Sequence, residues 1–232
     1  MDTLGNKNHL IGEIVANDFR TAKVFTNAGI DFCCGGKQSV SEVCKKMNIS
    51  EYELIQELKA VKQDPINHAL NFKEWELSFL IDYIINTHHK YVIHALPDLV
   101  MYSNKIASVH GENHPELKDI AEKVEAVNVE LIQHLKMEEE VLFPAIKQHV
   151  LNPVEETKST IRTEIERMLK EHDFAGSTLD EIQKTTQGYQ IPDDACNTYR
   201  VTFKLLKEFE DDIHVHVHLE NNILFPKILK MC

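Results

Sequence analysis

Residues 134–146 read HLKMEEEVLFPAI, and residues 216–228 read HVHLENNILFPKI. Both stretches follow the pattern H-x3-E-x3-L-F-P-x-I and match at every fixed position, 82 residues apart. A histidine and a glutamate four residues apart lie on the same face of a helix, one turn from each other. The two copies therefore predict two helices that each present an imidazole and a carboxylate to a shared metal site.

Apolar neighbours indicate that both pairs face a core. A buried carboxylate is costly without a partner, and two of them beside histidines are explained if they hold cations. The alternative is two surface pairs with ordinary helix hydrogen bonds, which this pattern favours less. The apolar residues that share a face with the pairs are Val127, Leu131 and Val141 on one helix and Phe209, Ile213 and Ile223 on the other.

Outward from the repeat, the apolar spacing predicts four long helices with breaks at segments that contain glycine or proline. Short connections make consecutive helices antiparallel neighbours. We therefore predict an all-α protein, an up-down-up-down four-helix bundle preceded by a small helical N-terminal domain. The bundle is predicted over residues 74–232, with helices at 74–108, 115–149, 155–187 and 193–229, and the N-terminal domain over 1–66.

The N-terminal domain carries clear start and stop signals. One helix is predicted from Ile11 to Ala28-Gly29, where glycine acts as the cap. Ser39 and Ser50 each stand three residues before a glutamate, the spacing of a capping box. Between them, residues 31–36 read DFCCGG, which indicates a tight turn with two adjacent cysteines. Pro65 is predicted to end the last helix and begin a linker.

The two other bundle helices also contain candidate ligands. His172 lies within an apolar stripe of its helix, and beside two H-x3-E copies we predict that it is a ligand. The first helix offers His88 and His89, and periodicity does not choose between them. Four imidazoles and two carboxylates suit iron, manganese or zinc, and two bridging carboxylates would leave each of two metals two histidines. His214 and His218 lie opposite His216 and are predicted to be solvated, and His9, His68, His94 and His149 are predicted at the surface.

The composition of the chain argues against some classes of function. The net charge of −12, with no basic stripe, disfavours nucleic-acid binding. No apolar run reaches the roughly 18–20 residues that span a bilayer, and no signal peptide is recognisable, so we predict a cytoplasmic protein without a membrane partner. The five cysteines do not have the regular spacing of a disulfide framework, which indicates that their thiols are reduced.

Taken together, these motifs resemble the iron–sulfur cluster repair di-iron proteins (RIC), which have a hemerythrin-like domain and an N-terminal domain with a Cys-Cys-Gly-Gly turn. The family's first-helix ligand lies seven residues before a Leu-Pro, and this register selects His89. The resemblance implies a centre of two iron ions, oxo- and carboxylate-bridged, with both glutamates as bridges. Its metal ligands would be His89, His134, Glu138, His172, His216 and Glu220, whereas Glu139, Glu140 and His218 would not affect the iron.

The resemblance also implies a function, the repair of iron–sulfur clusters damaged by nitric oxide or peroxide. The partners would be iron–sulfur proteins with damaged clusters, nitric oxide or oxygen as a small ligand, and a second copy in a homodimer. Cys33 and Cys34 would sense redox state or receive iron; the alternative is two small residues packed at a turn. His110 would act close to the ligands or in the mechanism, with a helix cap as the alternative.

Two other functions fit the same residues. One is enzymatic, a nitric-oxide reductase that consumes the gas at the open metal site. The other is a hemerythrin-like sensor that binds oxygen or nitric oxide. The sequence leaves open whether the protein is an enzyme.

Overall fold

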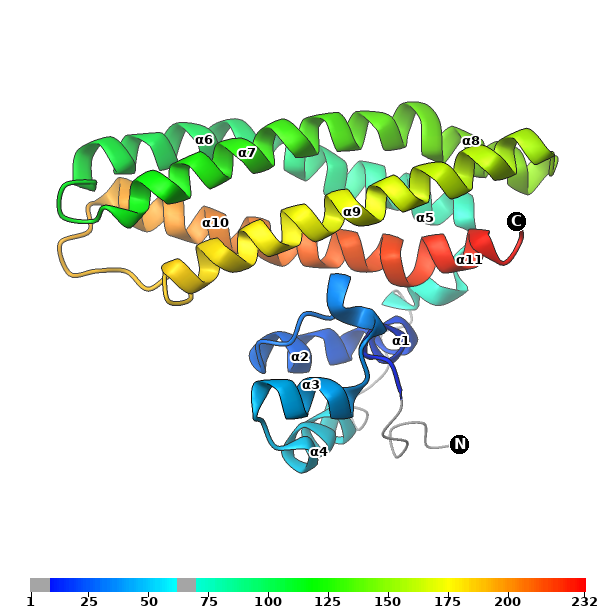
Figure 1. Ribbon diagram of the computed structural model, residues 1–232, viewed down its shortest axis with the longest axis horizontal. Helices are drawn as coiled ribbons and strands as arrows, with labels where there is room; N and C mark the ends of the chain where they lie inside the picture. The colour runs from blue at the N-terminus through cyan, green and yellow to red at the C-terminus, as the bar shows by residue number, and fades with distance from the viewer. Residues whose placement is uncertain (1–8, 62–69) are drawn as a thin grey trace. The chain divides into compact units, whose positions relative to one another are not determined.

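The computed structural model describes residues 9–61 and 70–232, and helices make up almost all of their regular structure (Figure 1). Within these residues the only strand-like pairing is one antiparallel bridge between Leu10 and Ser39. The all-α prediction is confirmed. The predicted linker at Pro65 lies outside the described residues. No helix in the described part of the chain is both long and apolar enough to cross a bilayer.

Short helices around an apolar centre build the N-terminal module. Ile11, Phe25 and Leu58 are almost completely buried there. The capping box of Ser39 forms, because its hydroxyl accepts the N–H of Glu42 and the Glu42 carboxylate accepts the N–H of Ser39 at 2.8 Å. The helices are α1 (Ile11–Asn17), α2 (Ala22–Asn27), α3 (Val40–Met47) and α4 (Glu51–Val61).

The prediction of one helix from Ile11 to Gly29 was wrong, because Asp18 interrupts it. Asp18 adopts an extended backbone and ends α1. Its carboxylate accepts the backbone N–H of Arg20 at 3.3 Å and pairs with the guanidinium of Arg20 at 2.7 Å, which starts a new turn. Gly29 follows α2 with φ +67°, the left-handed conformation that glycine adopts without strain.

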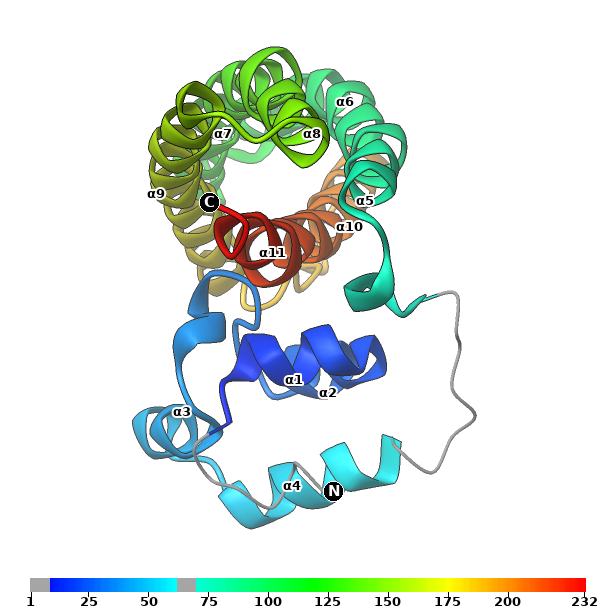
Figure 2. The same ribbon diagram turned by 90° about the vertical axis from the view of Figure 1, so that its right-hand side faces the viewer.

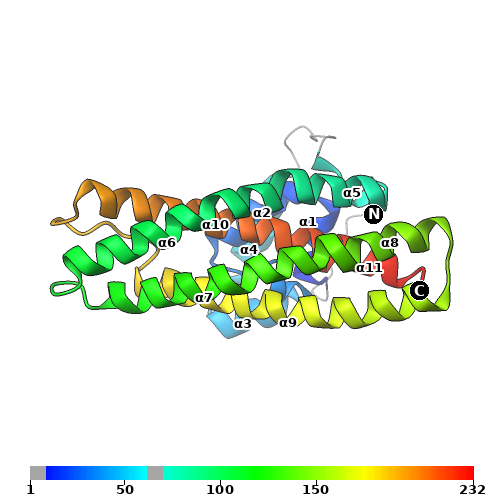
Figure 3. The same cartoon turned by 90° about the horizontal axis from the view of Figure 1, so that it is seen from above.

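Four long helices in alternating directions form the bundle, which Figure 2 shows end-on and Figure 3 from above. Helix α6 packs on α7, and α7 packs on α9. Pro97 lies inside α6, which continues past it. The long helices are α6 (Lys90–His110), α7 (Glu116–Met137), α9 (Glu155–Thr185) and α10 (Asn197–Leu219). Shorter helices adjoin three of them: α5 (Leu77–Ile84), α8 (Phe143–Leu151) and α11 (Phe225–Leu229).

Three five-residue π-helical segments connect these helices in the described chain. They are Ile85–His89 between α5 and α6, Glu138–Leu142 between α7 and α8, and Glu220–Leu224 between α10 and α11. A π turn holds one residue more than an α turn and occurs frequently at functional sites. Each of the three begins or ends at a predicted metal ligand.

The sequence repeat explains two of these π segments. The N–H of Phe143 donates to the carbonyl of Glu138, five residues back, and the N–H of Phe225 donates in the same way to Glu220. The next residue in both copies is a proline, which has no N–H to donate to the preceding turn. The Leu-Phe-Pro ending therefore favours the wider turn.

Contacts within the chain group it into two compact units. The first comprises residues 1–80 and 214–232, so it includes the N-terminal module and the end of the last helix. The second comprises residues 81–213 and holds most of the bundle. Helix α10 runs without a break from the second unit into the first.

Candidate metal centre

Three helical segments of the second unit bring histidines to one buried glutamate. The Nε2 atoms of His89 and His134 each lie 3.4 Å from Oε2 of Glu138. The Nε2 atom of His172 lies 3.1 Å from that of His134. All four side chains are at most 2% exposed. Imidazole nitrogens that converge on one buried carboxylate have the arrangement of metal ligands.

The second repeat contributes a matching pair. Nε2 of His216 lies 3.1 Å from Oε1 of Glu220, and both residues are at most 1% exposed. The possible ligand atoms of the six residues fall into two groups, and within each group all atoms lie within 4.8 Å of one another. Both glutamates belong to both groups. The groups are His89, Glu138, His216 and Glu220, and His134, Glu138, His172 and Glu220.

This donor set fits a cation. Two fully buried carboxylates would cost several kcal/mol each in an apolar interior unless positive charge compensates them. Imidazole and carboxylate without thiolate are ligands that suit iron, manganese or zinc. The two candidate ligand groups therefore overlap at Glu138 and Glu220.

Two further carboxylates hydrogen-bond two of the candidate ligand histidines. Oε1 of Glu139 lies 2.8 Å from Nδ1 of His89, and Oε2 of Glu171 lies 2.7 Å from Nδ1 of His134. The hydrogen bond with His134 lowers the pKa of Glu171. A carboxylate on Nδ1 fixes the tautomer that leaves Nε2 for a metal and increases its basicity. Sequence reasoning missed the role of Glu171 and predicted that Glu139 would not affect the iron, a prediction that its hydrogen bond with His89 now argues against. Each glutamate is adjacent in the chain to a predicted ligand.

His88 and His89 have different surroundings. His88 is 3% exposed, and its Nδ1 lies 2.9 Å from Oδ1 of Asp212. It belongs to neither of the two groups that the described residues form around the glutamates. His89 belongs to the first group, and its role as a metal ligand stays a prediction.

Two histidines that were expected to be solvated are buried, so these expectations were wrong. His149 is 2% exposed and bonds the hydroxyl of Thr157 at 2.8 Å. His218 is fully buried between the rings of Phe19 and Phe32, and burial lowers its pKa to about 4. The other histidines expected at the surface are exposed (His94), half-buried (His9 and His214) or outside the described residues (His68).

The two adjacent cysteines of the N-terminal module sit in unequal environments. Cys33 is buried and Cys34 is half-buried, and their sulfur atoms lie 4.0 Å apart, too far for a disulfide. The carboxylate of Asp31 accepts the N–H groups of Cys33 at 2.8 Å and of Cys34 at 3.1 Å, as well as the Cys33 thiol at 2.9 Å. The hydrogen bond with Cys34 and burial raise the pKa of Cys33, so its thiol stays protonated at neutral pH.

His110 lies at the other end of α6, about 30 Å along that helix from His89 at 1.5 Å per residue. It therefore cannot touch a metal that His89 holds. Its partner is Cys196, whose pKa is lowered to about 7 by the backbone N–H of Tyr199 and by His110.

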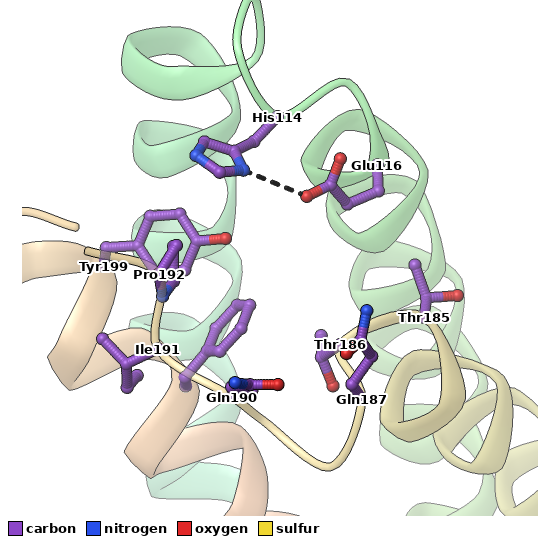
Figure 4. Close-up of a pocket in the computed structure, with 10 residues that line it drawn as sticks. His114, Glu116, Thr185, Thr186, Gln187, Gln190, Ile191, Pro192 and Tyr199 are labelled. Atoms are coloured by element: carbon purple, nitrogen blue, oxygen red, sulfur yellow. Dashed lines mark hydrogen bonds and ion pairs between the residues drawn. The ribbon is translucent and has the colours of Figure 1, made fainter. Parts of the chain in front are cut away.

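A cavity of about 260 Å³ opens at this end of the bundle (Figure 4). His114 points toward Glu116 in its lining, with Nδ1 and Oε1 3.2 Å apart, and the ring of Tyr199 forms part of its wall. The six candidate ligands are not among the described residues that line it.

Comparison with known proteins assigns the bundle. The family described as Hemerythrin HHE cation binding domain matches residues 80–228. The chain belongs to this family. Its bundle is thus a cation-binding domain of the hemerythrin type, and the buried histidines and glutamates form the site within it that suits iron. A second family, ScdA_N, a domain of unknown function (DUF542), matches residues 7–62.

Two relatives match nearly the whole chain. The iron-sulfur cluster repair protein YtfE of Yersinia pestis (strain Pestoides F) is 34% identical over 224 residues, which are 97% of this chain and 98% of the relative. The iron-sulfur cluster repair protein ScdA of Staphylococcus epidermidis (strain ATCC 12228 / FDA PCI 1200) is 31% identical over 223 residues, 96% and 98% of the two chains. The resemblance to the RIC proteins is confirmed.

Proposed function

We propose that this protein repairs iron–sulfur clusters damaged by nitric oxide or peroxide, and that its bundle holds two iron ions for this task. The observation that carries the proposal is the pair of overlapping ligand groups that share two buried glutamates. Relatives that match nearly the full chain and are named iron-sulfur cluster repair proteins support it.

Each side chain of the centre has a distinct role in this proposal. Glu138 and Glu220, which belong to both ligand groups, would hold both metal ions. The histidine pairs that complete the two groups are His89 with His216 and His134 with His172. When bound, the iron pair would supply iron for transfer or a place where nitric oxide or oxygen binds. The carboxylates of Glu139 and Glu171 hold their histidines in the tautomer that leaves Nε2 as a ligand.

The two cysteines of the turn have different roles in this proposal. Cys34 is the more accessible sulfur, so it is the one that meets a partner or a small oxidant. Cys33 is a buried, protonated thiol whose sulfur lies 4.0 Å from that of Cys34, and we assign it as the second sulfur of the pair that senses redox state or receives iron. The module that carries them is the domain we assign to residues 1–66, and the iron-binding domain occupies residues 74–232. We place the protein in the cytoplasm, acting on damaged iron–sulfur proteins as a homodimer.

The deciding experiment combines metal analysis with a repair assay. Protein from iron-supplemented cells is expected to hold about two irons per chain, with Mössbauer signals of a coupled pair. It is expected to restore an iron–sulfur enzyme inactivated by nitric oxide. Glu138→Ala and Glu220→Ala should each lose the pair and the repair activity, whereas Glu140→Ala, an exposed neighbour, should keep both.

Other results would point elsewhere. One metal per chain, or zinc alone after iron supplementation, would refute the two-iron centre. Steady production of nitrous oxide with a reductant, without repair, would identify a nitric-oxide reductase instead. Reversible oxygen or nitric-oxide binding with neither activity would indicate a sensor.

A further inference from the structure

The two copies of the repeat differ on the helix face that points away from the metal ligands. In the first copy this face carries Lys136 and Glu140, which are both exposed. The corresponding residues of the second copy are His218, which is 0% exposed, and Asn222, which is half-buried. Residues four apart share a helix face, so the second copy has an additional covered surface that the first lacks.

Asn222 binds the turn that carries the two cysteines. Its side-chain amide donates to the backbone carbonyl of Cys33 at 3.0 Å and lies 3.3 Å from the carbonyl of Phe32. The same Nδ2 atom lies 3.1 Å from Nδ1 of His218. His218 in turn hydrogen-bonds the backbone of Phe32 and packs against its ring, 5.4 Å between centroids. Both residues therefore hold the chain immediately before Cys34.

Two glycines of the N-terminal module leave room for this amide. A Cβ atom on Gly12 would lie 2.2 Å from Oδ1 of Asn222, and a Cβ atom on Gly36 would lie 2.6 Å from it. Neither glycine has a positive φ, so backbone conformation does not require glycine at these positions. Close approach to Asn222 does.

Asn222 also lies on the same element as a metal ligand. It is the third residue of the π segment Glu220–Leu224, two residues after Glu220. One five-residue turn therefore presents a ligand to the metal centre on one side and a hydrogen-bond donor to the cysteine turn on the other.

We propose that Asn222 is a positioning residue, which holds the Cys33–Cys34 turn in a fixed place on the helix that carries Glu220. This assignment rests on the proposed repair function only in its consequence, that the thiols and the iron centre act together. The anchoring itself is a property of the turn, and it can be measured without a repair assay.

The test uses the full-length, iron-loaded protein with Asn222→Asp, Asn222→Ala and Gly36→Ala variants. Aspartate keeps the shape of asparagine but replaces the donor with an acceptor that faces two carbonyls. The measurements are the alkylation rate of each cysteine by iodoacetamide, read by mass spectrometry, together with iron content and repair. Cys196, which lies in the other compact unit, serves as the internal reference. The matched control is Glu140→Ala at the equivalent position of the first repeat.

All three variants are expected to keep native iron content and absorption while Cys33 and Cys34 react roughly ten-fold faster, the size expected for the loss of such hydrogen bonds. Repair should fall in parallel, and Glu140→Ala should behave as the unmodified protein does. Unchanged alkylation in Asn222→Asp would overturn the proposal. Faster alkylation with full repair would support the anchoring and overturn its consequence, that the thiols and the iron centre act together. If the unmodified protein does not repair clusters, the proposed function fails, and the alkylation rates still decide whether Asn222 anchors the turn. Should Asn222→Ala not fold, Asn222→Asp and Gly36→Ala provide the same comparison.

Discussion

His88 and His89 are adjacent in the chain, yet their side chains have different partners. A step of one residue turns a helix by about 100°, so the two rings leave α6 in different directions. His89 reaches Glu138, whereas His88 bonds Asp212. Both are buried, so burial alone does not identify the ligand.

The different partners of His88 and His89 predict different effects when each is replaced by alanine. His89→Ala is expected to lower the iron content to about one ion per chain or less, because it removes one of two histidines at that position. His88→Ala should keep the iron and lose about 1–3 kcal/mol of stability, since it removes the hydrogen bond between the buried imidazole and the half-buried Asp212. Metal analysis and urea unfolding of both variants check this. The reverse result would show that the register of the family motif selects the wrong histidine.

The carboxylates of Glu139 and Glu171, which hydrogen-bond two candidate ligand histidines, are also expected to affect the affinity for metal. Glu139→Ala and Glu171→Ala are each expected to weaken metal binding about 10–100-fold, because the histidine beside each would lose its fixed tautomer. Competition with a chelator measures the affinity. Glu140→Ala, one residue from Glu139 and exposed, is the control. Equal iron retention in all three variants would show that these hydrogen bonds do not affect metal binding.

The π segments are the elements at which the bundle and the metal centre meet. In Glu138–Leu142 the extra residue widens the turn directly after the ligand, and the helix continues as α8 with its own buried face. Deleting one residue from such a turn converts it to an α turn and leaves the flanking faces nearly in place. The wider turn is therefore expected to set the direction of the Glu138 side chain rather than the packing of the helices.

Deletion of Glu140 should thus separate folding from metal binding. The variant is expected to keep its helix content by circular dichroism, but to hold less than about one iron per chain, because the Glu138 carboxylate is redirected. Glu140→Ala, which keeps the turn length, should hold the normal amount. Full iron loading of the deletion variant would show that the π turn has no role in directing the ligand.

A buried glutamate at the contact between α9 and α10 predicts that the stability of the protein depends on pH. Glu210 on α10 is 1% exposed, and burial raises its pKa from 4.5 to about 7, aided by the charges of Asp180 and Asp211 and opposed by hydrogen bonds with Tyr189 and Gln183. The folded protein therefore binds this proton more tightly than the unfolded chain does. As a result, the free energy of unfolding falls as pH rises from about 4.5 to about 7.

Glu210→Gln removes that titration. The variant should be more stable than the unmodified protein at pH 8 by about 1–3 kcal/mol, with a smaller difference at pH 5. Urea unfolding of the metal-free protein at both pH values measures the two differences. Parallel stability curves for the two proteins would mean that Glu210 is already ionised in the fold at neutral pH.

For the whole molecule, thiols and metal belong to different parts of the chain. The six candidate ligands include no sulfur, so Cys33→Ser/Cys34→Ser protein is expected to keep the same iron content and spectrum as the unmodified protein. It should nonetheless fail to restore an enzyme damaged by nitric oxide. Serine is nearly isosteric with cysteine, so a packing role would appear as slightly lower stability with repair retained. Loss of iron would instead mean that the cysteine turn helps to hold the metal site together.

Several features of this protein follow from its sequence alone. The two H-x3-E copies with Leu-Phe-Pro endings predict four of the six candidate ligands and the helices that carry them, because a helix places residues four apart on one face. Apolar spacing predicts the four long helices to within a few residues, and the stripe around His172 predicts its burial. All of this information is local to each helix.

Tertiary structure decided the features that depend on contacts between segments far apart in the chain. Periodicity states which residues share a face, but not what covers that face. His218 is buried because the N-terminal module covers its side of the helix, although the wheel correctly places it opposite His216. Glu139 and Glu171 gain their roles only when a histidine from another helix reaches them. His88 and His89 are separated for the same reason, since the partner of each is brought to it by the fold.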